Sequence, residues 1–229
     1  MDPWLRGSSV SAPQVDFTFP HHWQAQTLSE RPAILPARHF TYPNNAEEVE
    51  RGALEVLVRP QSLGPVAEEP VLSLSKDLDF ETRERVSARP VSKAAQPFLA
   101  TCALGFSDPL VPTGIWSTPD LEEICVISGG YAYLIDTTAP DRFTMLPYRP
   151  VLQVRPVPEN NLLLFIGHHA ILAWGEHGEA WQSPKLSHEG VTITTVDGGI
   201  IRGLGWNLIT DKEAPFALDL RTGALSQSR

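Results

Sequence analysis

Lysine and cysteine are both scarce in this chain of 229 residues. There are only four lysines, and the formal net charge is −9, so the sequence has no basic stripe that could displace counterions from a nucleic acid. We therefore expect no nucleic acid among its partners. The two cysteines, Cys102 and Cys125, stand in apolar contexts without metal-ligand spacing. This pattern favours two buried small hydrophobic residues, with a disulfide or redox pair as the alternative.

Long apolar runs and targeting signals are also missing. No window reaches the roughly 18 uninterrupted apolar residues of a membrane-spanning helix. The first 11 residues lack the charged start and apolar centre of a signal peptide. We therefore expect a cytoplasmic protein without a membrane partner. Its length and its 42 % of apolar residues suit one large all-β domain or two small ones.

Helix signals are few, and proline is concentrated in the first half, where 13 of the 21 prolines lie at or before Pro112. Because proline resists helix interiors and central strands, residues 1–40 are predicted to form an extended N-terminal arm. Residues 41–112 are predicted to be a Pro-rich β segment that packs on the remainder. This segment contains one short helix over 44–51, strands over 53–59, 71–75 and 97–106, and a loop over most of 76–97.

A glycine recurs every 38 residues in the second half, at Gly129, Gly167 and Gly205, each between two apolar runs. A fixed period of this size is typical of a repeated supersecondary unit that cannot bury its apolar face alone. Turn signals such as Asp197-Gly198-Gly199 separate the short strands, which favours antiparallel meanders. Residues 113–229 are therefore predicted to form three β repeats of about 38 residues.

The closing segment Phe216-Ala-Leu-Asp-Leu-Arg-Thr-Gly-Ala-Leu225 resembles the outer strand and turn of the β-propeller repeats found in quinoprotein-like proteins. The resemblance covers roughly residues 113–226 and implies blades of four strands. The first and second units lack the full Asp-x-x-Thr-Gly turn, and nothing matches a quinone-binding constellation, so no cofactor is expected.

The expected fold is accordingly all-β, with antiparallel four-stranded units in a β-propeller-like arrangement that the first half helps to close. A β-sandwich or stacked β-roll is the main alternative, and closure of a ring by two chains is another.

Two groups of residues are candidates for binding. Histidine with carboxylate is suitable for a transition metal, and the candidate ligands lie within 22 residues: His168, His177, His188 and Glu189. Adjacent histidines on a strand face opposite ways, so at most one of His168 and His169 serves a given site. Exposed aromatic faces stack on sugars or planar ligands. The candidates for that role are Trp174, Trp206, Asn207 and His169. Solvated histidines and core tryptophans are the plainer interpretations of both groups.

No catalytic motif is present: the chain has neither a Gly-x-Ser-x-Gly elbow nor a phosphate-binding loop. We therefore expect a non-catalytic β-repeat module that binds a protein partner. The alternatives are a binder of carbohydrate or another small ligand through tryptophan, and a metal-dependent enzyme that uses the histidine cluster. The sequence leaves homo-oligomerisation open.

Overall fold

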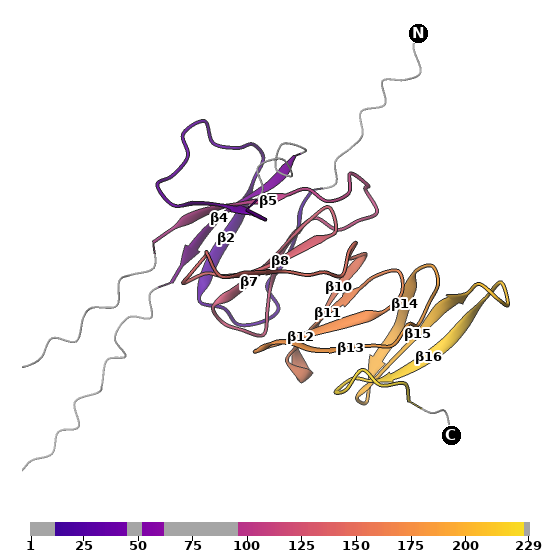
Figure 1. Ribbon diagram of the computed structural model, residues 1–229. Coiled ribbons are helices and arrows are strands. Elements are labelled where there is room, and N and C mark those ends of the chain that lie inside the picture. Colours follow the sequence, from indigo (N-terminus) through magenta and orange to yellow (C-terminus); the bar gives the residue numbers. More distant parts are fainter. Residues whose placement is uncertain (1–11, 45–51, 62–95, 227–229) are drawn as a thin grey trace, which may run out of the picture.

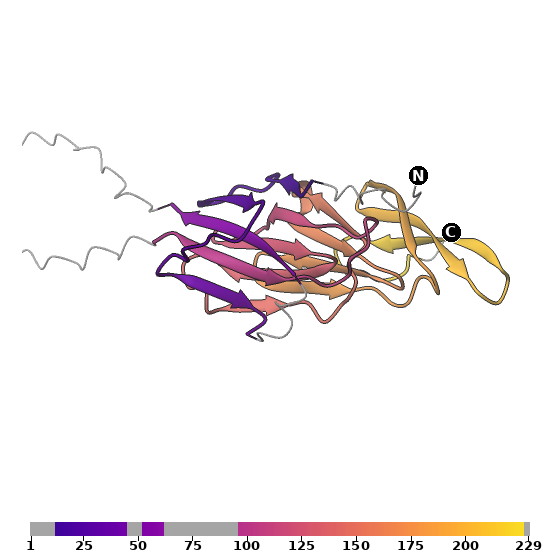
Figure 2. The same cartoon turned by 90° about the horizontal axis from the view of Figure 1, so that it is seen from above.

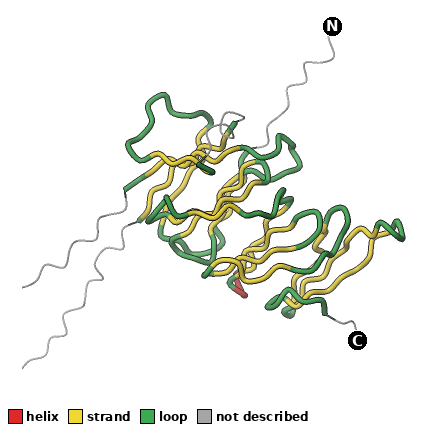
Figure 3. Tube along the Cα trace, viewed as in Figure 1, coloured by secondary structure: helices red, strands yellow, loops and turns green. Residues whose placement is uncertain are grey.

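The computed structural model describes residues 12–44, 52–61 and 96–226. Sixteen β-strands and the single 3-10 turn η1 (Pro158–Asn160) make up the regular structure of this part of the chain (Figures 1 and 3). The protein is all-β, as the sequence predicts. Within the described residues no helix has the length and apolar character needed to cross a bilayer.

The strands form four sheets, which we number in the order in which they stack. In each sheet the strands are given from one edge to the other. The first sheet contains β2 (Trp23–Leu28), β4 (Ala53–Pro60), β5 (Phe98–Ala103) and β3 (His39–Tyr42). The second contains β1 (Gln14–Asp16), β6 (Gly114–Ser117), β7 (Glu123–Ser128), β8 (Tyr131–Asp136) and β9 (Phe143–Met145). The third contains β10 (Gln153–Val157), β11 (Leu162–Ile166), β12 (Ile171–Gly175) and β13 (Gly178–Gln182). The fourth contains β14 (Val191–Asp197), β15 (Ile200–Asn207) and β16 (Lys212–Asp219).

The last three sheets are consecutive antiparallel meanders, β6 to β9, β10 to β13 and β14 to β16. Among the described strands, only the pairs β1–β6 and β3–β5 are parallel. The described sheets follow one another in an open row, from the first sheet to the fourth, and do not close into a ring (Figures 1 and 2). The chain therefore contains meanders like those of a propeller without the closed arrangement.

Three apolar cores lie between successive sheets. The first and second sheets enclose a core around Trp23, Phe98 and Tyr133, and the second and third sheets enclose another around Leu134 and Phe165. The core between the third and fourth sheets has these buried members: Val157, Leu162, Leu164, Ile166, Ile171, Ala173, Trp181, Val191, Ile201, Leu218 and Leu220. Each middle sheet thus buries both faces, which provides most of the hydrophobic stabilisation of the stack.

The two cysteines are free and completely buried, Cys102 in the first core and Cys125 in the second. Burial in apolar surroundings raises the pKa of both thiols well above the ordinary value. The prediction that they are buried small hydrophobic residues is confirmed.

The described part of the first half of the chain contributes five strands, β1 to β5, to the first two sheets. Within the segment predicted as an N-terminal arm, β1 pairs with β6 of the second sheet and β2 pairs with β4 of the first. Trp23 at the start of β2 is fully buried. The predicted strand over 71–75 lies outside the described residues. So do the predicted helix over 44–51, apart from residue 44, and the predicted loop over 76–97, apart from residues 96 and 97.

The three evenly spaced glycines occupy two kinds of position. Gly129 lies in the turn between β7 and β8, and Gly167 follows β11 at the corresponding turn of the third sheet. Gly205 instead lies inside β15, paired with Val191. The corresponding turn of the fourth sheet comes at residues 208–211, because β15 is longer than β7 and β11. The strand predicted over 207–210 was wrong, since these residues end β15 and form that turn.

Candidate functional site

The fourth sheet differs from its neighbours in its apolar pattern. The central strands of the second and third sheets are nearly continuous apolar runs, and every residue of β11 is buried. In β15 buried and exposed residues alternate, and β14 and β16 are mostly exposed or half-buried. A continuous run is typical of a strand that is covered on both faces, whereas alternation indicates one covered face. The fourth sheet therefore has a free face.

The strand register identifies the residues on this free face, because directly paired residues of an antiparallel ladder share a face. Ile193, Ile201 and Leu218 point into the core, so the alternate positions point outward. The outward residues form four rows across the sheet: Asp197, Ile200 and Asp219; Thr195, Arg202 and Ala217; Thr192, Leu204 and Pro215; and Trp206 with Glu213. We call these rows the outward face of the fourth sheet.

The hairpin of β15 and β16 extends beyond the rest of the fourth sheet, and its turn lies at the far end of the molecule in Figure 2. The side chains of Leu208 and Ile209 in this turn are 65 % and 90 % exposed. The Oδ1 atom of Asn207 accepts hydrogen bonds from the backbone N of Ile209 (2.9 Å) and Thr210 (3.2 Å), which holds the turn in a fixed shape. The turn therefore presents two apolar side chains to solvent on a defined support.

The base of this hairpin is fixed by the segment that links the third and fourth sheets. Ser187 is 2 % exposed, and its Oγ accepts hydrogen bonds from the backbone N of Trp206 (2.8 Å) and of Glu189 (3.1 Å). The backbone N of His188 donates to the carbonyl oxygen of Trp206 over 2.9 Å. Trp206, half-buried, is thus held on the outward face by two backbone contacts at its own position.

His169 joins this group through the same linking segment. Its carbonyl oxygen accepts from the backbone N of Leu186 over 2.7 Å, and its Nδ1 lies 3.2 Å from the carbonyl oxygen of Ser187. The structure therefore brings together five of the residues that the sequence proposes for binding. They are His169, His188, Glu189, Trp206 and Asn207.

The other candidate residues lie elsewhere. Trp174 is 6 % exposed in the core between the second and third sheets, so its indole has no free face for a ligand. His168 is exposed beside His169, with 6.1 Å between the ring centroids. His177 is in the turn between β12 and β13, whereas His168 is in the turn between β11 and β12. Successive turns of a meander lie at opposite ends of the sheet, so these two histidines are far apart. Among the described residues no three His, Cys, Asp or Glu side chains are placed to hold a metal ion together.

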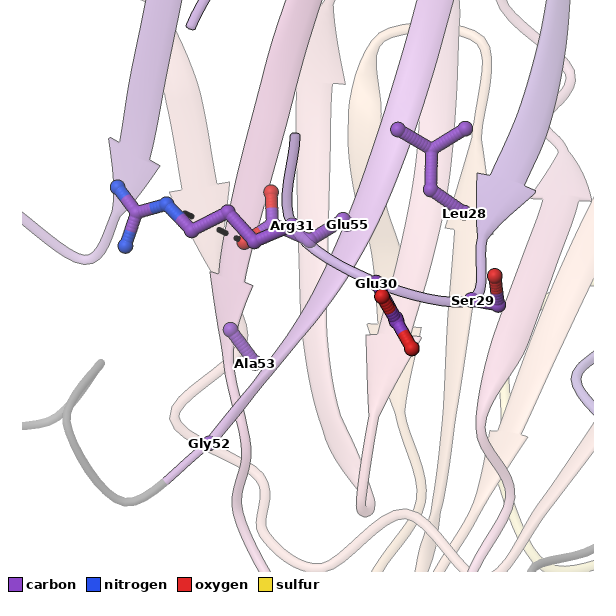
Figure 4. Close-up of a pocket in the computed structure, with 7 residues that line it drawn as sticks. All are labelled: Leu28, Ser29, Glu30, Arg31, Gly52, Ala53 and Glu55. Carbon is purple, nitrogen blue, oxygen red and sulfur yellow. Dashed lines mark ion pairs between the residues drawn. The ribbon is translucent and has the colours of Figure 1, made fainter. Parts of the chain in front are cut away.

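A polar cluster that the sequence analysis did not identify lies on the side of the first sheet facing away from the stack, and Figure 4 draws two of its members, Arg31 and Glu55. Thr101 Oγ1 donates to Glu55 Oε2 over 2.6 Å, and His39 Nε2 lies 2.8 Å from Thr101 Oγ1. Because an ionised carboxylate only accepts, the Thr101 hydroxyl points to Glu55 and accepts from His39. The Nε of Arg31 is 3.8 Å from Glu55 Oε1.

This cluster borders a hollow of about 250 Å³ formed by the start of the β2–β3 connection and β4. Burial, and then the positive charge of Arg31, lower the pKa of His39, which favours its neutral form. Thr101 is completely buried, so no substrate can reach its hydroxyl. The cluster therefore satisfies buried polar groups and fixes the connection over the sheet, and it lacks an accessible nucleophile.

A half-buried carboxylate, Glu123 at the start of β7, leads to a prediction on pH dependence. Burial raises the pKa of Glu123 from 4.5 to about 7, although Trp174 Nε1 donates to its Oε1 over 2.7 Å. Because the folded-state pKa lies above the ordinary value, the wild type loses stability as the pH rises from about 4.5 to about 7. We expect Glu123→Gln, which keeps an acceptor for Trp174, to stabilise the fold at pH 8 by about 2 kcal/mol, after allowance for solvent screening.

This gain should vanish at pH 4, where wild-type Glu123 is already protonated. Urea unfolding at the two pH values measures the difference, and Glu159→Gln, a change at an exposed position in η1, is the matched control. An equal effect of Glu123→Gln at both pH values would contradict the prediction.

The sequence analysis missed the apolar turn pair Leu208 and Ile209 and the outward charges Arg202 and Glu213. Arg202 was the signal that could have found the free face, because it places a charge inside an apolar segment, unlike the continuous apolar runs before it.

Comparison of the sequence with protein-family models and with curated proteins gave no match.

Proposed function

We propose that the chain is a non-catalytic interaction module, built from blade-like meanders of the β-propeller kind, that binds a protein partner through the outward face of the fourth sheet. The observation that carries this proposal is the outward face of the fourth sheet, which the described residues leave open at one end of a stack of packed sheets and which continues into the exposed turn of Leu208 and Ile209. Exposed apolar side chains on a rigid support are typical of protein–protein contact sites.

The shape and chemistry of this surface favour a protein over a small ligand. Small ligands bind in concave sites that enclose most of their surface. The outward face is instead a sheet surface, and its centre carries Leu204 and Pro215 between the charged side chains of Arg202 and Glu213. An apolar centre with a charged rim and a tryptophan beside it is the usual composition of a protein interface.

Site-specific photo-crosslinking tests this function. We expect a photoreactive phenylalanine analogue at Ile209 to crosslink a protein in the native cell, because this side chain is 90 % exposed at the hairpin turn. The same analogue at Leu110, which is 83 % exposed outside the fourth sheet, is the matched control and should crosslink nothing specific.

The captured protein is then purified and titrated against the wild type and against Leu208→Ser/Ile209→Ser. The double substitution should weaken binding at least about tenfold, because it removes apolar area at the contact. No crosslink at residue 209, or equal crosslinks at 209 and 110, would contradict the proposed function.

A further inference from the structure

The two ends of the stack differ in how they are covered. On the side of the first sheet facing away from the stack, Leu99 and Thr101 are completely buried. On the outward face of the fourth sheet, Thr192, Arg202 and Pro215 are exposed. The outer side of the first sheet also carries exposed residues, Gln24 and Arg59, but among the described residues its centre is closed, whereas the centre of the outward face of the fourth sheet is open. A second copy meeting the fourth sheet would bury this open centre in both copies.

The edge of the fourth sheet is a poor alternative for this contact. The backbone N of Ser226 donates to the carbonyl oxygen of Ala217, and the N of Asp219 donates to the carbonyl oxygen of Ala224. Ala217 and Asp219 thus direct their backbone N–H and C=O groups away from β15. Because this direction alternates from residue to residue along a strand, Pro215, two residues before Ala217, also faces away from β15. Proline has no N–H to donate, so Pro215 hinders the pairing of an added strand with the free edge of β16. The outward face is therefore a better surface for this contact than the β16 edge.

We propose that a second copy of this chain docks its fourth sheet face to face against the fourth sheet of the first, about a two-fold axis that lies between the sheets and crosses the strands at Leu204. This proposal rests on the proposed function and names the partner at the same surface. In a two-fold symmetric contact the same patch of each copy is used. A row on one side of the axis therefore meets the partner's row from the same distance on the other side, and these two rows must complement each other.

The rows complement each other about this axis. Arg202 and Trp206 each lie two residues from Leu204, about 7 Å at the rise of a β-strand. The axis therefore sets Arg202 against the partner's Trp206, with the partner's Glu213, paired with that tryptophan across the ladder, beside it. Neither Arg202 nor Glu213 belongs to any of the ion pairs found in the described part of the chain. The contact supplies both with an opposite charge and gives the guanidinium an aromatic face.

The outer rows also match. Ile200 lies four residues before Leu204, and Leu208 lies four residues after it, so the exposed apolar turn of one copy covers the half-buried Ile200 of the other. An axis parallel to the strands along β15 would instead place Arg202 against the partner's Arg202, and like charges in contact oppose association. The distribution of charge on the face thus selects the axis that crosses the strands.

Sedimentation equilibrium of the full chain over a range of micromolar concentrations tests this proposal. The wild type should be a dimer. Arg202→Glu and Glu213→Arg should each weaken dimerisation at least about tenfold, because each places two like charges in contact. The double variant Arg202→Glu/Glu213→Arg restores opposite charges across the axis and should recover dimerisation to within about threefold of the wild type. Arg59→Glu, an exposed charge reversal in the first sheet, is the matched control and should remain dimeric.

A monomeric wild type would overturn the proposal, and so would a dimer that is insensitive to Arg202→Glu or a double variant that stays monomeric. Circular dichroism of each variant distinguishes loss of contact from loss of fold. A monomeric wild type that still crosslinks a different protein from residue 209 would overturn this inference and leave the proposed function intact. A monomeric wild type without such a crosslink would overturn both.

Discussion

Replacing Trp181 by alanine is expected to cost about 3–5 kcal/mol of the free energy of unfolding, the range for a large aromatic side chain removed from a packed core. Trp181 in β13 is 7 % exposed between the third and fourth sheets, and its Nε1 donates to the carbonyl oxygen of Leu220 over 2.9 Å. The Trp181 ring also lies so close to Gly223 that a Cβ added at this glycine would overlap the ring. One side chain thus joins the third sheet to the turn that follows β16.

Guanidinium unfolding of the wild type, Trp181→Ala and Trp181→Phe measures this effect. The phenylalanine variant keeps most of the ring contacts and loses the hydrogen bond, so it should cost only about 1–2 kcal/mol. Hydrogen exchange should show the largest loss of protection in β14 to β16, because each sheet of the stack contacts only its neighbours. Equal stability losses for the two variants would show that packing of the indole is not what holds the fourth sheet.

The third sheet was the easiest part of the fold to predict. Leu162–Ile166 is an apolar run that follows a turn-rich Pro-Glu-Asn-Asn segment, and the structure forms β11 over the same residues. The reason is physical: a strand that is buried on both faces needs apolar residues at every position, so the run begins and ends where the strand does. Turn residues with little apolar character then separate it from its neighbours.

The fourth sheet was harder, because its apolar residues lie both in the core and at the surface. Leu208 and Ile209 resemble the interior of a strand, yet they form an exposed turn whose shape depends on the side chain of Asn207. Hydrophobic periodicity cannot separate a buried apolar pair from an exposed one. The strand predicted there was wrong for this reason.

The candidate site depended on connectivity that the sequence does not reveal. The clustered histidines are close in sequence, but the meander sends His168 and His177 to opposite ends of the third sheet. Trp206 and His169 are 37 positions apart in the chain, and the segment around Ser187 brings them together. Proximity in sequence therefore did not show which candidate residues lie together in the fold.

The close approach of Ser187 and its neighbours to β15 explains why residue 205 is a glycine, and it leads to a second large prediction. A Cβ at Gly205 would overlap the carbonyl oxygen of Leu186, a backbone atom that cannot move alone. We therefore expect Gly205→Ala to cost about 3 kcal/mol, at the upper end of the overpacking range. The displaced segment would also release the contact between Ser187 Oγ and the backbone N of Trp206, so tryptophan fluorescence should change in the folded state.

Gly175→Ala is the matched control, because the nearest atom to its added Cβ is the Cβ of Ala180 at 3.7 Å, an ordinary contact. It should change the free energy of unfolding by less than about 1 kcal/mol. Denaturant unfolding of both variants makes the comparison. If they lose equal stability, then the linking segment does not press on β15, and Trp206 is placed on the outward face by the sheet alone. If Gly205→Ala alone is costly, the 38-residue spacing contains two different requirements: turns at Gly129 and Gly167, and at Gly205 space for the backbone that holds the hairpin.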